Sequence, residues 1–219
     1  MSGHEAVIFD NDGLLLDTEE AWTRAERTLF ARRARVFTIE HKRLLIGSAH
    51  REAATKLEAM LELPGEGEQL LEELHELVME EALAGVAPRP GALALLERLT
   101  AAGTRLAVAS NSRRAFVERT LRAAGLLEEP FAEIVCLEDV PRAKPAPDIY
   151  LEACRRLGAD PARSAALEDS PTGVAAALAA GMFVIGVPYL AEIQLAGTDL
   201  LAASLADPAV ARALGLDSA

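Results

Sequence analysis

The sequence has few aromatic residues, few cysteines and fewer positive than negative charges. Aromatic residues make up 4% of the 219 residues and hydrophobic residues 51%, so we expect an aliphatic, helix-rich core. The net charge of −12 leaves no broad cationic face of the kind that binds nucleic acid or an anionic membrane. We therefore expect a small-molecule ligand, and an anionic one would need a locally positive pocket.

The two cysteines, Cys136 and Cys154, lack the spacing of a metal site. Both lie in apolar patterns, so we expect buried free thiols in a reducing compartment. No stretch reaches the roughly 18 consecutive apolar residues that a membrane span needs. The first residues also lack the charged and then apolar pattern of a secretion signal. We therefore expect a cytoplasmic protein, and we also expect a monomer.

The chain contains two kinds of pattern. Residues 16–85 have helical periodicity without a convincing strand, which predicts an inserted all-α cap domain. Residues 1–15 and 86–219 alternate short apolar runs with helical patterns, which predicts an α/β core domain. Repeated βα units favour a Rossmann-like parallel sheet with helices on both faces. The predicted strands are 6–9, 105–109, 133–136, 165–168 and 183–187. The predicted helices are 19–34, 50–61, 70–84, 92–102, 113–124, 148–157 and 172–180.

The most informative stretch is the first apolar run, in which Ala6–Phe9 is followed by Asp10, Asn11, Asp12 and Gly13. Such a run predicts a buried strand that delivers carboxylates to one edge of a sheet. Side chains two apart on a strand share a face, so Asp10 and Asp12 can converge on one object. Paired carboxylates need a shared proton or a hard cation such as Mg²⁺. Alternatively, one acid caps the following turn and the other is solvated.

Polar residues also follow two later strands. Ser110 and Asn111 come after the 105–109 run, where a hydroxyl and main-chain N–H groups at a helix start can bind phosphate. Ser112 could be the N-cap of that helix, and both roles can hold because different residues serve them. Lys144 precedes a proline, which disfavours helix and predicts a rigidly placed, extended loop. A lysine fixed there suits phosphate binding, although an isolated lysine is more commonly solvated.

The 165–168 run ends in two adjacent acids, Glu168 and Asp169. Ser170 as an N-cap and Pro171 at the first helical position explain the next two residues, but not the acids. Additional carboxylates beside the first strand are what an octahedral magnesium site requires, and Gly173 would let the main chain approach a ligand. Because ligands of parallel sheets bind beyond the carboxyl ends of the strands, these strand ends together predict one site.

The segments DGLLLDTE, ASNS, KPAPDIY and EDSPTGVAAALAAGM extend this pattern. Over essentially the whole chain, the sequence resembles the haloacid dehalogenase-like superfamily. Within that superfamily it is similar to the branch of sugar-phosphate phosphatases and β-phosphoglucomutase relatives with a helical cap. The resemblance implies that Asp10 is a nucleophile that becomes phosphorylated and that Asp12 is the general acid and base.

The resemblance also implies which residues bind phosphate and metal. Ser110 and Lys144 would hold the transferred phosphate. Asp10, Asp169 and the main-chain carbonyl of Asp12 would hold Mg²⁺, with Glu168 in close support. The implied activity is a magnesium-dependent phosphatase that acts on a small phosphorylated metabolite, such as a sugar phosphate.

Two alternatives stay open: a β-phosphoglucomutase-like sugar phosphomutase and a non-catalytic sensor of phosphorylated ligands. Mutase relatives carry a histidine at the position of Trp22, and tryptophan cannot shuttle protons, which favours the phosphatase. Trp22 either lines the substrate pocket or packs the first cap helix against the core. Arg51 lies near the place where relatives bind substrate with an arginine, with the register shifted by about one residue.

Overall fold

The computed structural model describes residues 3–46, 48, 50–82 and 85–216, in which parallel strands form one sheet. Its order is β3-β2-β1-β4-β5-β6, so β1 lies between β2 and β4. The strands are β1 (Ala6–Phe9), β2 (Arg105–Ala109), β3 (Glu133–Val135), β4 (Ala165–Glu168), β5 (Phe183–Gly186) and β6 (Leu200–Leu201). The carboxyl ends of β1, β2 and β4 therefore lie side by side.

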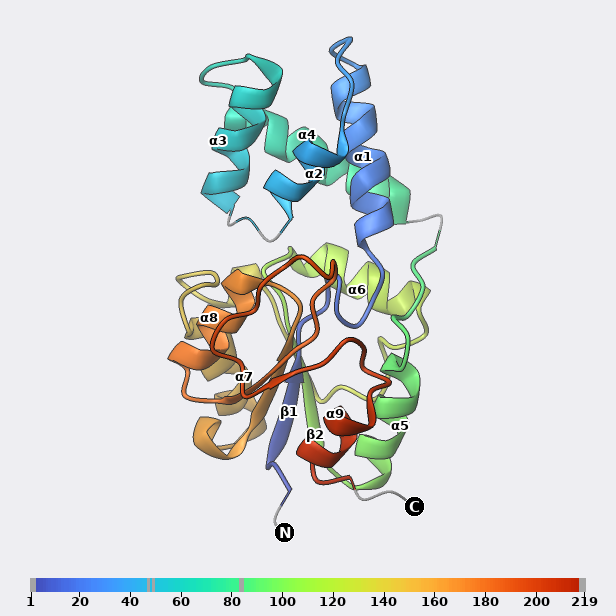
Figure 1. Cartoon of the computed structure of the whole chain (residues 1–219), viewed down its shortest axis with the longest axis vertical. Helices are drawn as coiled ribbons and strands as arrows, with labels where there is room; N and C mark the ends of the chain where they lie inside the picture. Colours follow the sequence, from blue (N-terminus) through green and yellow to red (C-terminus); the bar gives the residue numbers. More distant parts are fainter. Residues whose placement is uncertain (1–2, 47, 49, 83–84, 217–219) are drawn as a thin grey trace.

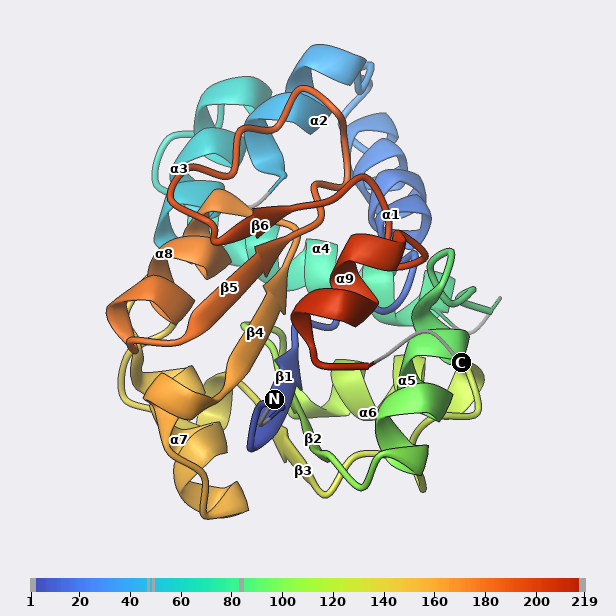
Figure 2. The ribbon, with the colours of Figure 1, turned by 60° about the horizontal axis from the view of Figure 1, so that its bottom comes forward.

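Helices cover the sheet on both faces, as Figure 2 shows. The helices that flank it are α5 (Ala92–Ala101), α6 (Arg114–Ala123), α7 (Asp148–Leu157), α8 (Pro171–Ala179) and α9 (Pro208–Ala213). Alternate residues of β1 point to opposite faces, as the strand period requires. Val7 and Phe9 pack in the cluster that contains residues of α5, α6 and α9, whereas Ala6 and Ile8 pack in the cluster with α7 and α8.

Between β1 and α5 in the chain, helices α1 to α4 stand apart from the sheet (Figure 1). These helices, called the insert below, are α1 (Glu19–Ala31), α2 (Ile39–Leu45), α3 (His50–Leu61) and α4 (Gly67–Glu81). The chain enters and leaves the insert through two adjacent segments. The N–H of Asp17 donates to the carbonyl of Ala87 at 2.8 Å, and the N–H of Arg89 donates to that of Leu15 at 2.8 Å.

The predicted fold class, a parallel α/β sheet with an all-α insert, is confirmed, and the predicted strands are present within one or two residues. Helix α2, strand β6 and helix α9 were not predicted. Helix α2 begins with a capping box in which Thr38 and His41 bond reciprocally, and His at the third position is not the usual partner. Within the part of the chain that the structure describes, no helix is long and apolar enough to cross a membrane.

Candidate active site

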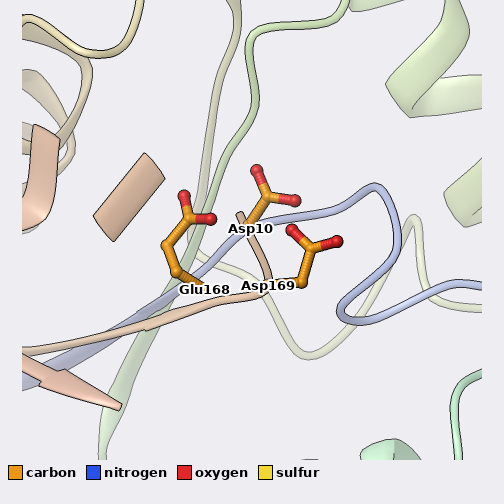
Figure 3. A group of neighbouring side chains, drawn as sticks. All are labelled: Asp10, Glu168 and Asp169. Atoms are coloured by element: carbon orange, nitrogen blue, oxygen red, sulfur yellow. The ribbon is translucent and has the colours of Figure 1, made fainter. Parts of the chain in front are cut away.

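Carboxylates converge where β1 and β4 end, as Figure 3 shows for Asp10, Glu168 and Asp169. One oxygen of each lies within 4.8 Å of the others, and all three residues are buried. Burial raises the pKa of Asp10 and of Asp169 well above the ordinary range, and each is raised further by its acidic neighbours. Hard oxygen ligands so placed suit a divalent cation, which would relieve this repulsion. The donor set therefore fits a metal ion.

Lys144 lies against two of these acids. Its Nζ donates to Asp10 Oδ1 at 2.6 Å, to Glu168 Oε1 at 2.6 Å and to the carbonyl of Ala109 at 2.9 Å. Burial opposes the charge on this lysine, but the two carboxylates outweigh it, so its pKa is raised above the ordinary value. Lys144 is therefore a permanent cation held in place by three acceptors.

Two other side chains fix this arrangement. Asn111 lines the cavity, but its amide holds the main chain of Lys144: Nδ2 donates to the Lys144 carbonyl at 3.2 Å, and the Lys144 N–H donates to Oδ1 at 2.9 Å. On the other side, the buried hydroxyl of Tyr150 donates to Glu168 Oε1 at 2.6 Å. Oxygen Oε1 of Glu168 is thus bound by Tyr150 and Lys144, and Oε2 accepts only a longer bond, at 3.3 Å, from Ser170 among the described residues.

The carboxylate of Asp12 is held by two serines and not by the acidic group. Its Oδ2 accepts a hydrogen bond from Ser110 Oγ at 3.0 Å and one from Ser112 Oγ at 2.7 Å. The alternative that Ser112 is the helix N-cap is wrong, because α6 starts at Arg114 without a side-chain cap. The expected N-cap role of Ser170 is confirmed, since its Oγ accepts from the N–H of Gly173 at 3.1 Å.

Two glycines leave room for the acids. Gly13 has φ +80°, and a Cβ there would collide with a carboxylate oxygen of Asp169. At Gly173 a Cβ would collide with the carboxylate of Glu168. Both glycines therefore have to lack a side chain for β1 and β4 to present their carboxylates as they do.

A cavity of about 200 Å³ opens above these residues, and residues of the insert form its other wall. Its core wall includes Asp10, Asp12, Ser110, Lys144 and Asp169. Its insert wall includes Glu19, Trp22 and Glu26 of α1, Lys42 and Leu45 of α2, His50 and Ala53 of α3, and Leu71, Leu74 and His75 of α4. Both parts of the chain therefore contribute to one cavity.

The two insert residues considered from the sequence lie in different places. Trp22 packs edge-on against Phe116 of the core, with ring centroids 6.0 Å apart, which confirms the packing interpretation. It also lines the cavity, and its contact with a substrate stays a prediction. Arg51 is exposed and is not among the described residues that line the cavity, whereas the adjacent His50 is. The structure thus brings His50, and not Arg51, to the cavity.

Sequence reasoning did not find the buried polar residues of the insert. Lys42 forms ion pairs with Glu19 at 2.6 Å and with Glu26 at 3.1 Å, and their side chains are 8%, 14% and 3% exposed. No motif surrounds Lys42, and the helix in which it lies, α2, was not predicted. Tyr150 could have been found, because it closes the KPAPDIY segment that also contains Lys144.

Comparisons with known proteins show which family the chain resembles. The model of the haloacid dehalogenase-like hydrolases matches residues 4–181. A bifunctional riboflavin kinase/FMN phosphatase of Arabidopsis thaliana is 34% identical over 184 residues, which are 84% of this chain and 48% of that protein. The chain thus spans about half the length of this relative.

Two further similarities cover nearly whole proteins. A phosphorylated carbohydrates phosphatase of Thermotoga maritima is 33% identical over 179 residues, which are 81% of this chain and 82% of that protein. The crystal structure of CbbY from Rhodobacter sphaeroides in complex with phosphate has a TM-score of 0.79 and 33% identity. That match covers 93% of this chain and 96% of the other.

Proposed function

Because this chain belongs to the haloacid dehalogenase-like hydrolases, we propose that it is a magnesium-dependent phosphatase of small phosphorylated metabolites. The observation that carries the proposal is the contact of Lys144 with Asp10 beside Asp169, where a nucleophile, a fixed cation and a metal ligand meet. Sugar phosphates are the proposed substrate class. The name of the Thermotoga maritima relative and the phosphate bound to CbbY support that class.

In the first step, a carboxylate oxygen of Asp10 attacks phosphorus and forms an aspartyl phosphate. The bond between phosphorus and the leaving oxygen breaks, and Asp12 donates a proton to that oxygen. Ser112 holds the carboxyl group of Asp12 at the cavity wall while this happens. Ser110 has a single hydroxyl proton, so it would turn this proton from Asp12 to the incoming phosphate, which is the role expected from its position after β2.

In the second step, water attacks phosphorus and Asp12 accepts a proton from that water. The bond between phosphorus and Asp10 breaks, which releases phosphate and restores the Asp10 carboxylate. Lys144 contacts Asp10 throughout and offsets the negative charge that accumulates on the phosphoryl group. A magnesium ion would be held by Asp10, Asp169 and the main-chain carbonyl of Asp12, with Glu168 in support, and when bound it supplies further charge stabilisation.

The insert would act as a cap in this reaction. In this proposal residues 16–85 form the cap domain, and residues 1–15 and 86–219 form the core domain. The shared cavity supports this division, because α1 to α4 supply one wall and the strand ends supply the other. A closed cap excludes water from the aspartyl phosphate until the leaving group has departed.

The test is phosphate release from a panel of sugar, nucleoside and short-chain phosphates, with and without Mg²⁺. We expect magnesium-dependent release by the wild type and a loss of about 10³-fold or more in Asp10→Asn, which keeps the shape of the side chain. The control is Glu80→Gln, a matched amide substitution at an exposed position of α4.

Two outcomes would replace the proposal. Conversion of a sugar phosphate into its isomer without phosphate release would make the protein a phosphomutase, despite Trp22. Magnesium binding with no turnover of any substrate would indicate a sensor of phosphorylated ligands.

A further inference from the structure

Every lysine that lines the cavity is already paired. Among the described residues, the charged groups of the lining are five carboxylates and two lysines, Lys42 and Lys144. Lys144 contacts Asp10 and Glu168, each at 2.6 Å. Lys42 contacts Glu19 and Glu26. No arginine is among these lining residues, so the insert wall offers no unpaired lysine or arginine to a second anionic group.

The acids on Lys42 leave the insert wall without net positive charge, because Glu19 balances the lysine and Glu26, whose pKa burial raises to about 7, adds negative charge as pH rises. Glu19 is the first residue of α1, and its charge also contributes to the raised pKa of Asp169 in the core. The negative charge therefore extends from the metal-binding acids up to the insert. A phosphate dianion bound to this wall would face Glu19 and Glu26 and would have to take Lys42 from them.

His75 adds a polar group without adding charge. Its Nδ1 is buried and has no hydrogen-bond partner among the described residues. The ring meets Trp22 edge-on at 5.7 Å and stacks on His50 at 6.1 Å between centroids. Burial and the nearby Arg113 lower the pKa of His75 to about 4, so the ring is neutral near pH 7. A neutral imidazole suits a hydroxyl group and does not attract a phosphate.

We propose that the insert wall selects a substrate with a single phosphate and an uncharged, hydroxyl-rich leaving group, which contacts His75 and the paired charges of Lys42, Glu19 and Glu26. This inference rests on the proposed phosphatase function and narrows its substrate class. Ion-paired carboxylates and ammonium groups bond well to hydroxyls, which accept and donate at once. A bisphosphate of the same sugar adds a second dianion, for which the described part of this wall offers no unpaired lysine or arginine.

The experiment compares a hexose 6-phosphate with the 1,6-bisphosphate of the same hexose, with Mg²⁺ present. We expect kcat/KM to be about tenfold or more higher for the monophosphate, because like charges at a binding wall are strongly unfavourable. Glu26→Gln leaves Lys42 with one acid and should lower this ratio about fivefold, mainly through KM for the bisphosphate. Glu80→Gln, which makes the same change on the surface of the insert, should leave the ratio unchanged.

A second variant tests the leaving group directly. His75→Phe keeps a ring against Trp22 but removes both nitrogens, so KM for the hexose 6-phosphate should rise about fivefold. KM for phenyl phosphate, which has no hydroxyl on its leaving group, should not change. If Glu26→Gln does not fold, the proposal is still tested by the wild-type ratio of kcat/KM for the two hexose phosphates and by the KM values of His75→Phe.

The outcomes separate the two proposals. Equal or better turnover of the bisphosphate by the wild type would overturn the single-phosphate inference while leaving the phosphatase intact. An equal rise of KM for both monophosphates in His75→Phe would overturn the hydroxyl contact. Absence of phosphate release from any of these compounds would instead refute the phosphatase function itself.

Discussion

The cavity contains two buried lysines that look alike but differ in what surrounds them. Lys144 of the core and Lys42 of the insert each pair with two carboxylates at 2.6–3.1 Å. Lys144 also bonds to a main-chain carbonyl and lies 5.0 Å from the ring centroid of Tyr150, and a third acid, Asp169, is close by.

This difference indicates different roles for the core half of the cavity, around Lys144, and the insert half, around Lys42. Around Lys144 there are more carboxylates than one lysine can neutralise, which leaves room for a divalent cation. Around Lys42, the two acids Glu19 and Glu26 each form an ion pair with the lysine. Among the described residues, no group of three carboxylates that could hold a metal ion lies in the insert. The core half is therefore suited to reaction chemistry, and the insert half to recognition.

Turnover gives the strongest test of this contrast. Lys144→Met removes a cation that contacts Asp10, so kcat should fall by about 10³-fold. Lys42→Met should mainly raise KM, by about tenfold, because Lys42 is proposed to contact only the leaving group. Steady-state kinetics on one sugar phosphate distinguishes the two. A fall in kcat of similar size in both variants would contradict the division of roles.

Stability in the absence and presence of Mg²⁺ gives the next test. Each lysine variant leaves buried carboxylates without their cation, which should cost about 3 kcal/mol of unfolding free energy. Mg²⁺ should restore part of that loss in Lys144→Met, because the ion binds the acids that remain. Mg²⁺ should restore none of the loss in Lys42→Met. Urea denaturation with and without Mg²⁺ measures the unfolding free energy of each variant. An equal recovery in the two variants would contradict the separation of the acids around Lys144 from those around Lys42.

The pH dependence of stability examines the insert cluster alone. Burial outweighs the attraction of Lys42 and raises the pKa of Glu26 from its ordinary 4.5 to about 7. The folded state therefore binds more protons between these pH values, and the stability from Glu26 is complete below pH 4.5 and lost as pH rises through 7. Relative to Glu26→Gln, the wild type should lose at most about 3 kcal/mol over that range. Urea denaturation at several pH values measures the unfolding free energy of both proteins. A difference between them that does not change between pH 4.5 and 7 would contradict the prediction.

The smallest effect concerns the neighbouring residues His50 and Arg51. Arg51 is exposed and is not part of the described cavity lining, so Arg51→Ala should change kcat/KM less than about twofold. His50→Ala removes a lining ring that stacks on His75, and KM should rise a few-fold. If the larger effect came from Arg51, the cap would have to place that arginine over the substrate.

The core half of the site could be predicted because its chemistry follows strands. Asp10 and Asp169 come directly after a strand, and Lys144 lies before a proline in the loop after β3; parallel strands bring their carboxyl ends to one edge. The sheet was also predictable, because short apolar runs that alternate with helical patterns are typical of buried parallel strands. Strand β6 has two residues, too few for a periodic signal.

The insert half could not be predicted, because its buried charges lie on different helices and no short sequence motif connects them. Lys42 and Glu26 are 16 residues apart and come together only when α1 and α2 pack. In the sequence, Lys42 looks like an ordinary surface lysine of a short helix. The partners of Asp12 were hidden in a different way: Ser112 fits the N-cap rule, and only the start of α6 at Arg114 shows that its hydroxyl serves the acid.

The paired entry and exit segments of the insert have a consequence for engineering. Leu15 and Asp17 bond to Arg89 and Ala87, so the main chain enters and leaves the insert at one place. The residues of the insert wall, from Glu19 to His75, lie in one continuous stretch between these segments, whereas Asp10, Lys144 and Asp169 lie outside it. Exchanging residues 18–86 for the corresponding stretch of a relative would replace the whole insert wall of the cavity and leave Asp10, Lys144 and Asp169 unchanged.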